Sequence, residues 1–462
     1  MKTKLTNHVT IILVFSLLQA CNDADFLEEK RDSNQVIPQT LEDYRALMYN
    51  SQRINQESAL LLAQVGTDEY SISDVRWNNM SQVYEKNGSI WASDIFEGTE
   101  SLDWNFGYRK VLYCNVVLEG ISRLESQGAE SSQAAGELKG TALFHRALAF
   151  YELAQLFCDT YTEASAESTA GIPLRLESDI NMVSSRASVR QTYEQITADL
   201  SLAESYLPVS QAIKEHPTKR AALALLARVY LQMGKFEQAL AAAERVLQQG
   251  DDPLDFSNLE ISPNFMFDYR GANNPDVIFY NAHGQLSIES PSNTSVNPER
   301  YAEYEDGDLR KQAFFLLRED GSIEYRGSYT GGVRSFTGLT IGETLLIAAE
   351  ASSRTGQFSR TRSYLSVLLE ARYIPQAMPQ LDTLSEEDLL LCITQQRKKE
   401  LFKRGIYWSD LKRLNRDGTW RITLRRVIGS LEYTIPPNDP RYVYPIPEQV
   451  IRISGIAQNN RE

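Results

Sequence analysis

Aromatic and amide side chains occur together in two irregular stretches of the chain, 66–102 and 255–337. Aromatic rings stack on the apolar faces of sugar rings, and planar amides bond to hydroxyl groups. Trp77 is the leading candidate for such a contact, because Arg76, Asn78 and Asn79 give it a polar setting. The full set of candidate ligand contacts is Trp77, Asn78, Trp91, Tyr280, Asn281, His283 and Tyr329. For any one of these aromatic residues, packing inside its loop is the alternative.

Metal, cofactor and catalytic chemistry have little support in the sequence. The four histidines are far apart and no HExxH motif occurs. The four cysteines, Cys21, Cys114, Cys158 and Cys392, form no CxxC pair. GxSxG and P-loop motifs are missing as well, so we expect no metal site, no cofactor and no catalytic residue. A surface enzyme with two catalytic carboxylates, as in a glycosidase, stays an alternative because the chain has 61 Asp and Glu residues.

Composition places the chain among ordinary globular proteins. It has 462 residues, of which 42% are hydrophobic and 23% charged. The net charge is -14. Phosphate binding needs a concentrated basic surface, so this charge argues against a nucleic-acid partner.

Helices are the elements expected to hold the two aromatic stretches. Apolar residues recur with helical spacing over 103–125, 136–158, 190–207, 217–250 (broken at Gly234), 340–373 (broken at Gly356) and 385–415. Ser188 and Ser385 stand where N-caps are expected, and Pro208 stands where the third helix should stop.

The segment broken at Gly234 has the spacing of a tetratricopeptide repeat. Its positions are Ala227, Tyr230, Gly234, Phe236, Ala239, Ala243 and Val246. The segment broken at Gly356 repeats the layout, with Thr361 in the place of the small Ala239, and is therefore degenerate. The alternative is an antiparallel helix hairpin of another kind. Repeats need neighbours to bury their faces, so the flanking helices are expected to join the stack.

Residues 1–20 have the features of a secretory signal. Lys2 and Lys4 precede an apolar stretch from Val9 to Leu18, which is too short to span a bilayer. The stretch ends Leu18-Gln19-Ala20-Cys21, which resembles a bacterial lipobox and predicts that Cys21 is the lipidated first residue of the mature protein. An ordinary signal peptide followed by a chance cysteine is the alternative.

Motifs spread along the whole chain resemble those of the SusD/RagB family of outer-membrane nutrient-binding lipoproteins. They comprise Lys139 to Tyr161, Thr218 to Tyr230, Asp308-Leu309-Arg310, Gly342 to Ala351, Glu400 to Arg413, Tyr444-Pro445-Ile446-Pro447, and Gln458-Asn459. Two positions depart from the family pattern, since Lys403-Arg404 replaces an acidic residue and Tyr407 replaces an arginine. Arg397, Asp410 and Arg413 are interpreted as structural ion pairs between helices.

The resemblance implies a mainly α fold, a tetratricopeptide-like superhelix with long irregular loops and short β-hairpins. A single domain, 21–462, would follow the signal peptide. Its parts would be a helical scaffold (about 103–254 and 338–415), ligand-facing loops (about 66–102 and 255–337) and a C-terminal irregular segment (416–462).

By the same resemblance, the protein would be a non-enzymatic surface lipoprotein. It would capture an oligosaccharide or a peptide and act as the lid of a SusC-like, TonB-dependent outer-membrane transporter. The open alternatives are a surface glycan-processing enzyme and a tetratricopeptide-type scaffold that binds protein partners.

Overall fold

The computed structural model describes residues 38–128, 132–250, 252–262 and 264–461. It divides into two units, Met1–Thr40 and Leu41–Glu462, and the elements described below belong to the second. Cys21 and the predicted signal peptide lie outside the described residues. No helix in the described part of the chain has the length and apolar character needed to cross a membrane.

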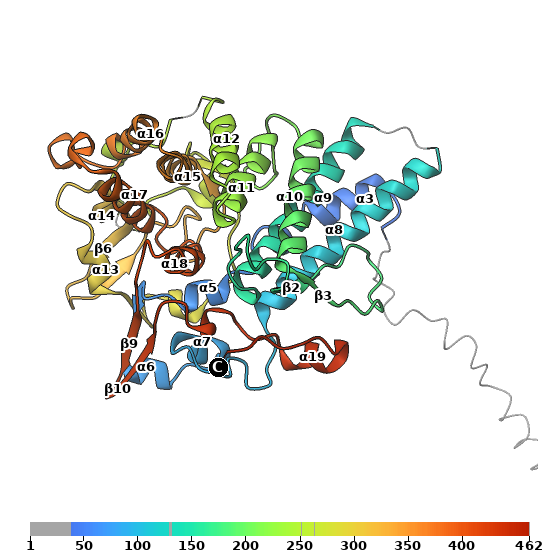
Figure 1. Ribbon diagram of the computed structural model, residues 1–462, viewed down its shortest axis with the longest axis horizontal. Helices are drawn as coiled ribbons and strands as arrows, with labels where there is room; N and C mark the ends of the chain where they lie inside the picture. The colour runs from blue at the N-terminus through green and yellow to red at the C-terminus, as the bar shows by residue number, and fades with distance from the viewer. Residues whose placement is uncertain (1–37, 129–131, 251, 263, 462) are drawn as a thin grey trace, which may run out of the picture. The chain divides into compact units, whose positions relative to one another are not determined.

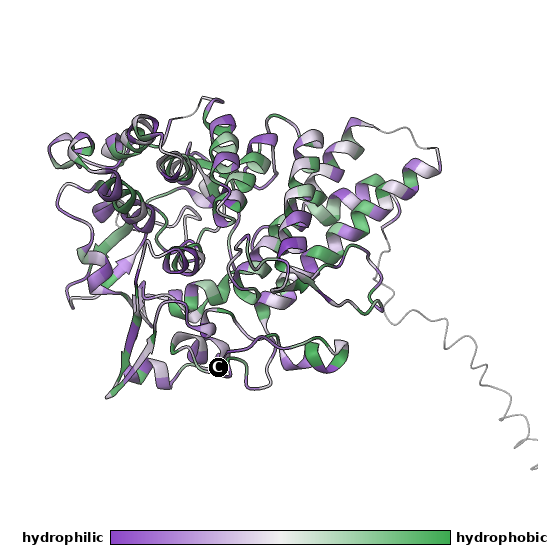
Figure 2. Cartoon of the chain, in the orientation of Figure 1, coloured by the Kyte–Doolittle hydropathy of each residue, from purple (hydrophilic) through white to green (hydrophobic). Residues whose placement is uncertain are grey.

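A stack of antiparallel helices forms the scaffold (Figure 1). Its members are α8 (Leu102–Ser126), α9 (Gln133–Phe157), α10 (Val189–Tyr206), α11 (Lys219–Gln232), α12 (Phe236–Leu247), α15 (Ile341–Arg354), α16 (Phe358–Glu370), α17 (Glu386–Glu400) and α18 (Tyr407–Arg416). Each helix from α8 to α12 packs on the next, and α15 packs on α12, so the stack resumes after the 255–337 stretch. Figure 2 shows hydrophobic and hydrophilic residues mixed along these helices, as helices with one buried side require.

Local signals set the helix ends as the sequence predicts. Ser188 begins α10 with a full capping box, in which its hydroxyl accepts from Gln191 N and the Gln191 side chain accepts from Ser188 N. Ser385 caps α17 by accepting from Asp388 N. Both predicted N-caps are confirmed.

The two predicted glycine turns are confirmed. Gly234 separates α11 from α12 with φ 71, and Gly356 separates α15 from α16 with φ 74. Both values lie in the left-handed region that favours glycine. Thr361, the degenerate position, is fully buried, and its hydroxyl is 2.9 Å from Ser352 Oγ and 3.2 Å from Gln357 O. The second repeat therefore accommodates the larger residue by bonding its hydroxyl group.

The single helix predicted over 385–415 is wrong. The chain forms α17 and α18 with a break between Glu400 and Tyr407. Lys403 has φ 54 and Gly405 has φ 68, which no helix tolerates. Lys403 N donates to the buried carboxylate of Glu69 at 2.9 Å, a partner that is distant in sequence. A long-range contact therefore overrides the local helical pattern.

The strands are short and paired two by two. The antiparallel pairs in the described residues are β1 (Tyr70–Ser71) with β5 (Ser295–Val296), β2 (Ala170–Pro173) with β3 (Arg186–Ser188), β4 (Val277–Phe279) with β8 (Leu339–Thr340), β6 (Phe315–Leu317) with β7 (Ile323–Tyr325), and β9 (Leu424–Ile428) with β10 (Leu431–Ile435). The β2–β3, β6–β7 and β9–β10 pairs join consecutive strands, as the predicted hairpins do, whereas the β1–β5 and β4–β8 pairs join strands that are distant in the sequence. The β1–β5 pair joins the two aromatic stretches.

Short helices fill the remaining connections. They are α3 (Leu41–Met48), α4 (Ser51–Ile54), α5 (Leu61–Val65), α6 (Asp74–Asn78), α7 (Val83–Ser89), α13 (Pro298–Ala302), α14 (Leu309–Phe314) and α19 (Glu448–Ser454). The 255–337 stretch has a hydrophobic cluster of its own, built around Phe256, Phe267, Phe314, Phe315 and Phe336. Its irregular backbone is thus packed on aromatic side chains.

The C-terminal segment docks on the end of α9. Tyr444 N donates to Leu156 O at 2.9 Å, and Asn459 Nδ2 donates to Phe157 O at 2.9 Å. Lys412 Nζ donates to Gln155 O at 2.9 Å and to Cys158 O at 2.6 Å. The last carbonyl groups of a helix have no hydrogen-bond partner within it, and the negative end of the helix dipole attracts cations there. This contact accounts for the position of the 444–447 and 458–459 motifs.

Candidate ligand-binding surface

Trp77 lies on the surface, on the short helix α6. Ser73 begins this helix by accepting from Arg76 N at 3.3 Å. The Trp77 indole N–H is shared between Lys86 O at 3.2 Å and Ser89 Oγ at 3.1 Å, so one edge of the ring is fixed to α7. The Lys86 ammonium lies over the ring, 4.6 Å from its centroid. The ring is half-buried and Asn78 is exposed, which leaves an aromatic surface beside an amide.

The β9–β10 hairpin lies beside α6. Figure 1 shows its strands beside α6, and a Cβ on Gly429 at the hairpin turn would lie 3.9 Å from Asp74 Cβ. Val75 on α6 is 63% exposed, and Val427 and Leu431 on the hairpin are 51% and 60% exposed. Val427 and Leu431 point to opposite faces of the hairpin, because Leu431 pairs with Ile428 and Val427 with Glu432. We call the surface formed by Trp77 and Asn78 the α6 surface. It offers an aromatic ring with a polar edge.

The other five candidate contacts are buried, and the ligand role predicted for them does not fit their positions. Trp91 and Tyr329 are 1% exposed, Tyr280 is 3% exposed, and Asn281 and His283 are 0% exposed. A ligand at the surface therefore has no access to them. The sequence placed them in irregular stretches, but the 255–337 stretch has a core of its own, and Trp91 is part of the main hydrophobic core.

Each of the five has a structural partner. Trp91 Nε1 donates to Gly66 O at 2.9 Å, and Tyr329 Oη donates to Asp276 Oδ2 at 3.0 Å. Tyr280 packs against the Phe336 ring, with centroids 6.0 Å apart.

Asn281 and His283 are both fully buried and bonded to other parts of the protein. Asn281 Nδ2 donates to Glu152 Oε1 at 3.0 Å and to Thr337 Oγ1 at 3.1 Å. His283 Nδ1 is 2.6 Å from Gly284 O, and its Nε2 is 3.3 Å from Glu289 Oε1. These contacts connect α9 to the 255–337 stretch, so the two polar residues orient backbone segments.

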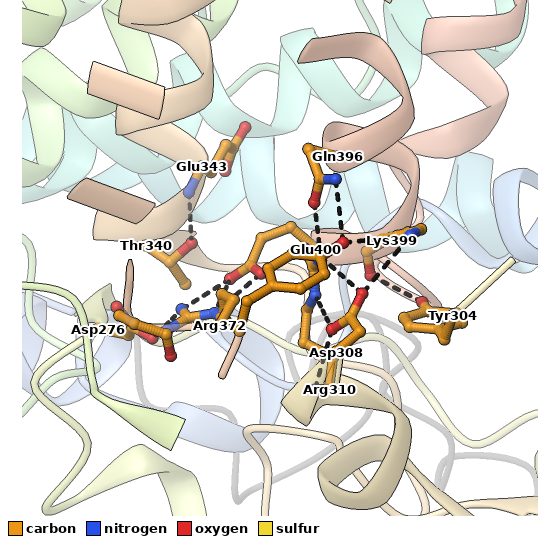
Figure 3. Close-up of polar contacts among 12 residues, drawn as sticks. Asp276, Tyr304, Asp308, Arg310, Thr340, Glu343, Arg372, Gln396, Lys399 and Glu400 are labelled. Atoms are coloured by element: carbon orange, nitrogen blue, oxygen red, sulfur yellow. Dashed lines mark hydrogen bonds and ion pairs between the residues drawn. The ribbon is translucent and has the colours of Figure 1, made fainter. Parts of the chain in front are cut away.

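A network of buried charges fixes the same stretch to α17 (Figure 3). Arg310 bonds Asp308 through Nε and Nη2, both at 2.9 Å, and contacts Glu400 at 3.4 Å. Arg372 bonds Glu400 and Asp276, each at 2.8 Å. Burial by itself would raise the pKa of Glu400, but the Arg372 and Arg310 guanidinium groups outweigh it and lower the pKa to about 2. The Asp308-Leu309-Arg310 motif is therefore structural.

The interpretation of Arg397, Asp410 and Arg413 as ion pairs is confirmed. Asp410 accepts from Arg397 Nε and from Arg413 Nε, both at 2.8 Å. Arg413 also bonds both oxygens of Glu350, at 2.6 and 2.8 Å, and so connects α18 to α15. These charged groups hold helices together and do not face a ligand.

Two further observations bear on other kinds of site. No group of three or more His, Cys, Asp or Glu side chains within the described ranges is placed to hold a metal ion. Cys114, Cys158 and Cys392 are free thiols.

One exposed aromatic residue escaped the sequence-based selection. Tyr269 belongs to the 255–337 stretch and is 69% exposed, the opposite of Tyr280 and Tyr329. The signal that could have found it is the run Gly271-Ala272-Asn273-Asn274-Pro275, two residues further along the chain, which is typical of a surface turn.

Comparisons with known proteins agree with this architecture. A family model described as SusD-like, "Starch-binding associating with outer membrane", matches residues 25–231, and a tetratricopeptide-repeat model matches residues 209–259. SusD-like protein P2 of Formosa agariphila is 29% identical over 392 residues, which cover 69% of this chain and 72% of that protein.

Solved structures extend the likeness over most of the chain. A SusD superfamily protein of Bacteroides thetaiotaomicron superposes with a TM-score of 0.72 at 21% identity, over 91% of this chain and 100% of the other. A putative sugar-binding protein of Bacteroides vulgatus superposes with a TM-score of 0.73 at 20% identity, over 92% and 99%. The fold is thus that of a helical-repeat protein with tetratricopeptide-like helix pairs. The predicted resemblance to the SusD/RagB family is confirmed by the family model over residues 25–231 and by the relative in Formosa agariphila.

Proposed function

We propose that the protein is a cell-surface, carbohydrate-binding lipoprotein of the outer membrane that delivers its ligand to a SusC-like, TonB-dependent transporter and acts as its lid. The observation that carries the proposal is the match to a family described as starch-binding and associated with the outer membrane. The α6 surface supports it, since an anchored indole beside a free amide suits a sugar ring and its hydroxyl groups. A peptide is the alternative ligand.

Trp77→Ala tests the ligand-binding part. If Trp77 stacks on the ligand, its removal should weaken binding about thirtyfold, the usual loss for an aromatic anchor worth about 2 kcal/mol. The melting temperature should fall only slightly, because the ring is half-buried. Affinity electrophoresis and calorimetry with a panel of soluble polysaccharides and peptides would measure the change.

Trp91→Phe is the matched control. It removes the buried indole N–H that donates to Gly66 O and should lower the melting temperature while leaving affinity unchanged. Unchanged affinity in Trp77→Ala would exclude Trp77 from the site.

A partner surface on the helical stack supports the transporter part of the proposal. Leu202 on α10 is 45% exposed, and Val209 and Ile213 after it are 71% and 48% exposed. Val209 and Ile213 line the same surface pocket, and apolar side chains exposed together are typical of docking surfaces. Val209→Glu should reduce co-purification of the transporter from detergent-solubilised membranes and leave polysaccharide binding intact.

The enzyme alternative predicts turnover of a bound glycan. The carboxylates of Asp276, Asp308, Glu350 and Glu400 are fully buried and each is bonded to arginine, so they do not reach a substrate. Incubating the purified protein with each polysaccharide it binds, and analysing the products, would detect hydrolysis. Product release would refute the proposal of a non-enzymatic binder.

A further inference from the structure

Tyr269 is presented to solvent at a structural cost. Its side chain is 69% exposed, so the ring gains little from packing. The next residue, Arg270, has φ 56 and ψ 27, a left-handed conformation that is unfavourable for a residue with a side chain. Strained backbone that persists without a packing benefit is characteristic of functional positions.

Contacts from three distant segments hold the strained residue in place. Arg270 N donates to Thr330 O at 3.0 Å. Its Nη1 donates to Glu215 Oε1 at 2.6 Å and to Ser51 Oγ at 3.2 Å. The turn is therefore rigid, and a rigid binding group loses little entropy when a ligand binds.

Gly331 packs against the backbone of the same turn. A Cβ at this position would lie 2.7 Å from Tyr269 N and 2.8 Å from Tyr269 Cα, and the residue has φ +66. Both the close approach and the backbone conformation call for glycine. The position of Tyr269 thus depends on a backbone contact that no other residue type permits without displacement.

The surroundings of the ring are polar. The Arg270 guanidinium lies over the ring, 5.0 Å from its centroid, which fixes one face and leaves the other to solvent. Asn273 Nδ2 donates to Asp268 Oδ2 at 2.6 Å, so an amide and a carboxylate on the same turn as Tyr269 already orient each other. An open aromatic face with planar polar groups at its edge is suited to a sugar ring and its hydroxyl groups.

We propose that Tyr269 is a second carbohydrate contact, whose open face stacks on a sugar ring while Asp268 and Asn273 bond to its hydroxyl groups. The proposal rests on the carbohydrate-binding function proposed above and adds a platform outside the α6 surface. A protein partner fits this position less well, because the exposed residues nearest to Tyr269 in sequence, Asp268, Ala272, Asn273 and Pro275, are small or polar.

Affinity electrophoresis tests the proposal with soluble polysaccharides as probes: a starch-type glucan, a β-glucan, a xylan and a polyuronate. For the polysaccharide that slows the wild-type protein in the gel, Tyr269→Ala should weaken binding at least about tenfold, as loss of an aromatic contact does. Tyr269→Phe should retain binding, because the ring is kept. Gly331→Ala should also weaken polysaccharide binding although the Tyr269 ring is still present, because the added methyl group displaces the turn.

Tyr206→Ala is the matched control, since Tyr206 is also an exposed tyrosine with a cation, Lys139, 5.2 Å from its ring centroid. It should leave polysaccharide binding unchanged. Thermal melts of all variants should coincide with that of the wild type within about 2 °C, apart from Gly331→Ala.

The outcomes separate this inference from the proposed function. If Trp77→Ala weakens binding and Tyr269→Ala does not, the inference is wrong and the function stands. If Tyr269→Ala abolishes co-purification of the transporter without changing polysaccharide affinity, Tyr269 is a docking residue and the inference is overturned. If no polysaccharide retards the wild-type protein, the proposed function fails and the inference fails with it.

Discussion

Glu350→Gln should destabilise the protein by about 3 kcal/mol at neutral pH. Glu350 is 0% exposed, and both of its oxygens accept from Arg413. Burial by itself would raise the pKa of this carboxyl, but Arg413 outweighs it and lowers the pKa from its usual 4.5 to about 2. Each pKa unit corresponds to about 1.4 kcal/mol, so the difference gives about 3 kcal/mol. Breaking a buried ion pair typically costs a similar amount, about 3–5 kcal/mol.

The pH dependence follows from the direction of the pKa change. Because the folded state has the lower pKa, the stabilisation is complete above about pH 4.5 and is lost as the pH falls towards about 2. The difference between wild type and Glu350→Gln should therefore shrink from about 3 kcal/mol at pH 7 to about 1 kcal/mol at pH 3. Urea unfolding at both pH values measures it.

Two comparisons make this prediction specific to the ion pair. Glu319→Gln changes an exposed glutamate and should alter stability by less than about 0.5 kcal/mol. The double variant Glu350→Gln, Arg413→Gln should cost less than the sum of the single variants, because the two side chains interact directly. A loss below about 1 kcal/mol at pH 7, or one that does not vary with pH, would refute the reasoning.

Two further predictions concern the repeat turn and the N-terminus. Gly234→Val should lower the free energy of unfolding by about 1–3 kcal/mol. The cost comes from the backbone conformation, because φ is +71 and only Phe236 Cζ, at 4.0 Å, is near the new side chain. Gly136→Ala, inside α9, is the control, and equal stability of Gly234→Val and wild type in urea would contradict the turn. Cys21→Ser should move the protein from membrane to soluble fractions if Cys21 is acylated, and a variant that stays membrane-bound would show that another feature anchors the chain.

Most of the helical scaffold could be predicted because its signals are local. The helix predicted over 103–125 is observed at Leu102–Ser126, and the one predicted over 190–207 at Val189–Tyr206. Caps, apolar spacing and turn glycines all act within a few residues. The break between α17 and α18 was missed because Glu69, which bonds Lys403 N, lies 334 residues away.

The candidate site was harder to predict because burial of an aromatic residue depends on distant partners. Tyr329 and Tyr269 both stand among glycine, serine and asparagine in one irregular stretch, and composition does not separate them. Tyr329 Oη donates to Asp276 Oδ2 at 3.0 Å, and the Arg404 guanidinium lies 4.2 Å from the Tyr329 ring centroid. The Tyr329 ring is therefore enclosed. The cation over Tyr269 comes from the adjacent residue, Arg270, whose guanidinium is held by Glu215 and Ser51, so the ring stays outside. Which tyrosine can meet a ligand is therefore decided by where the chain brings Asp276, Arg404 and Glu215.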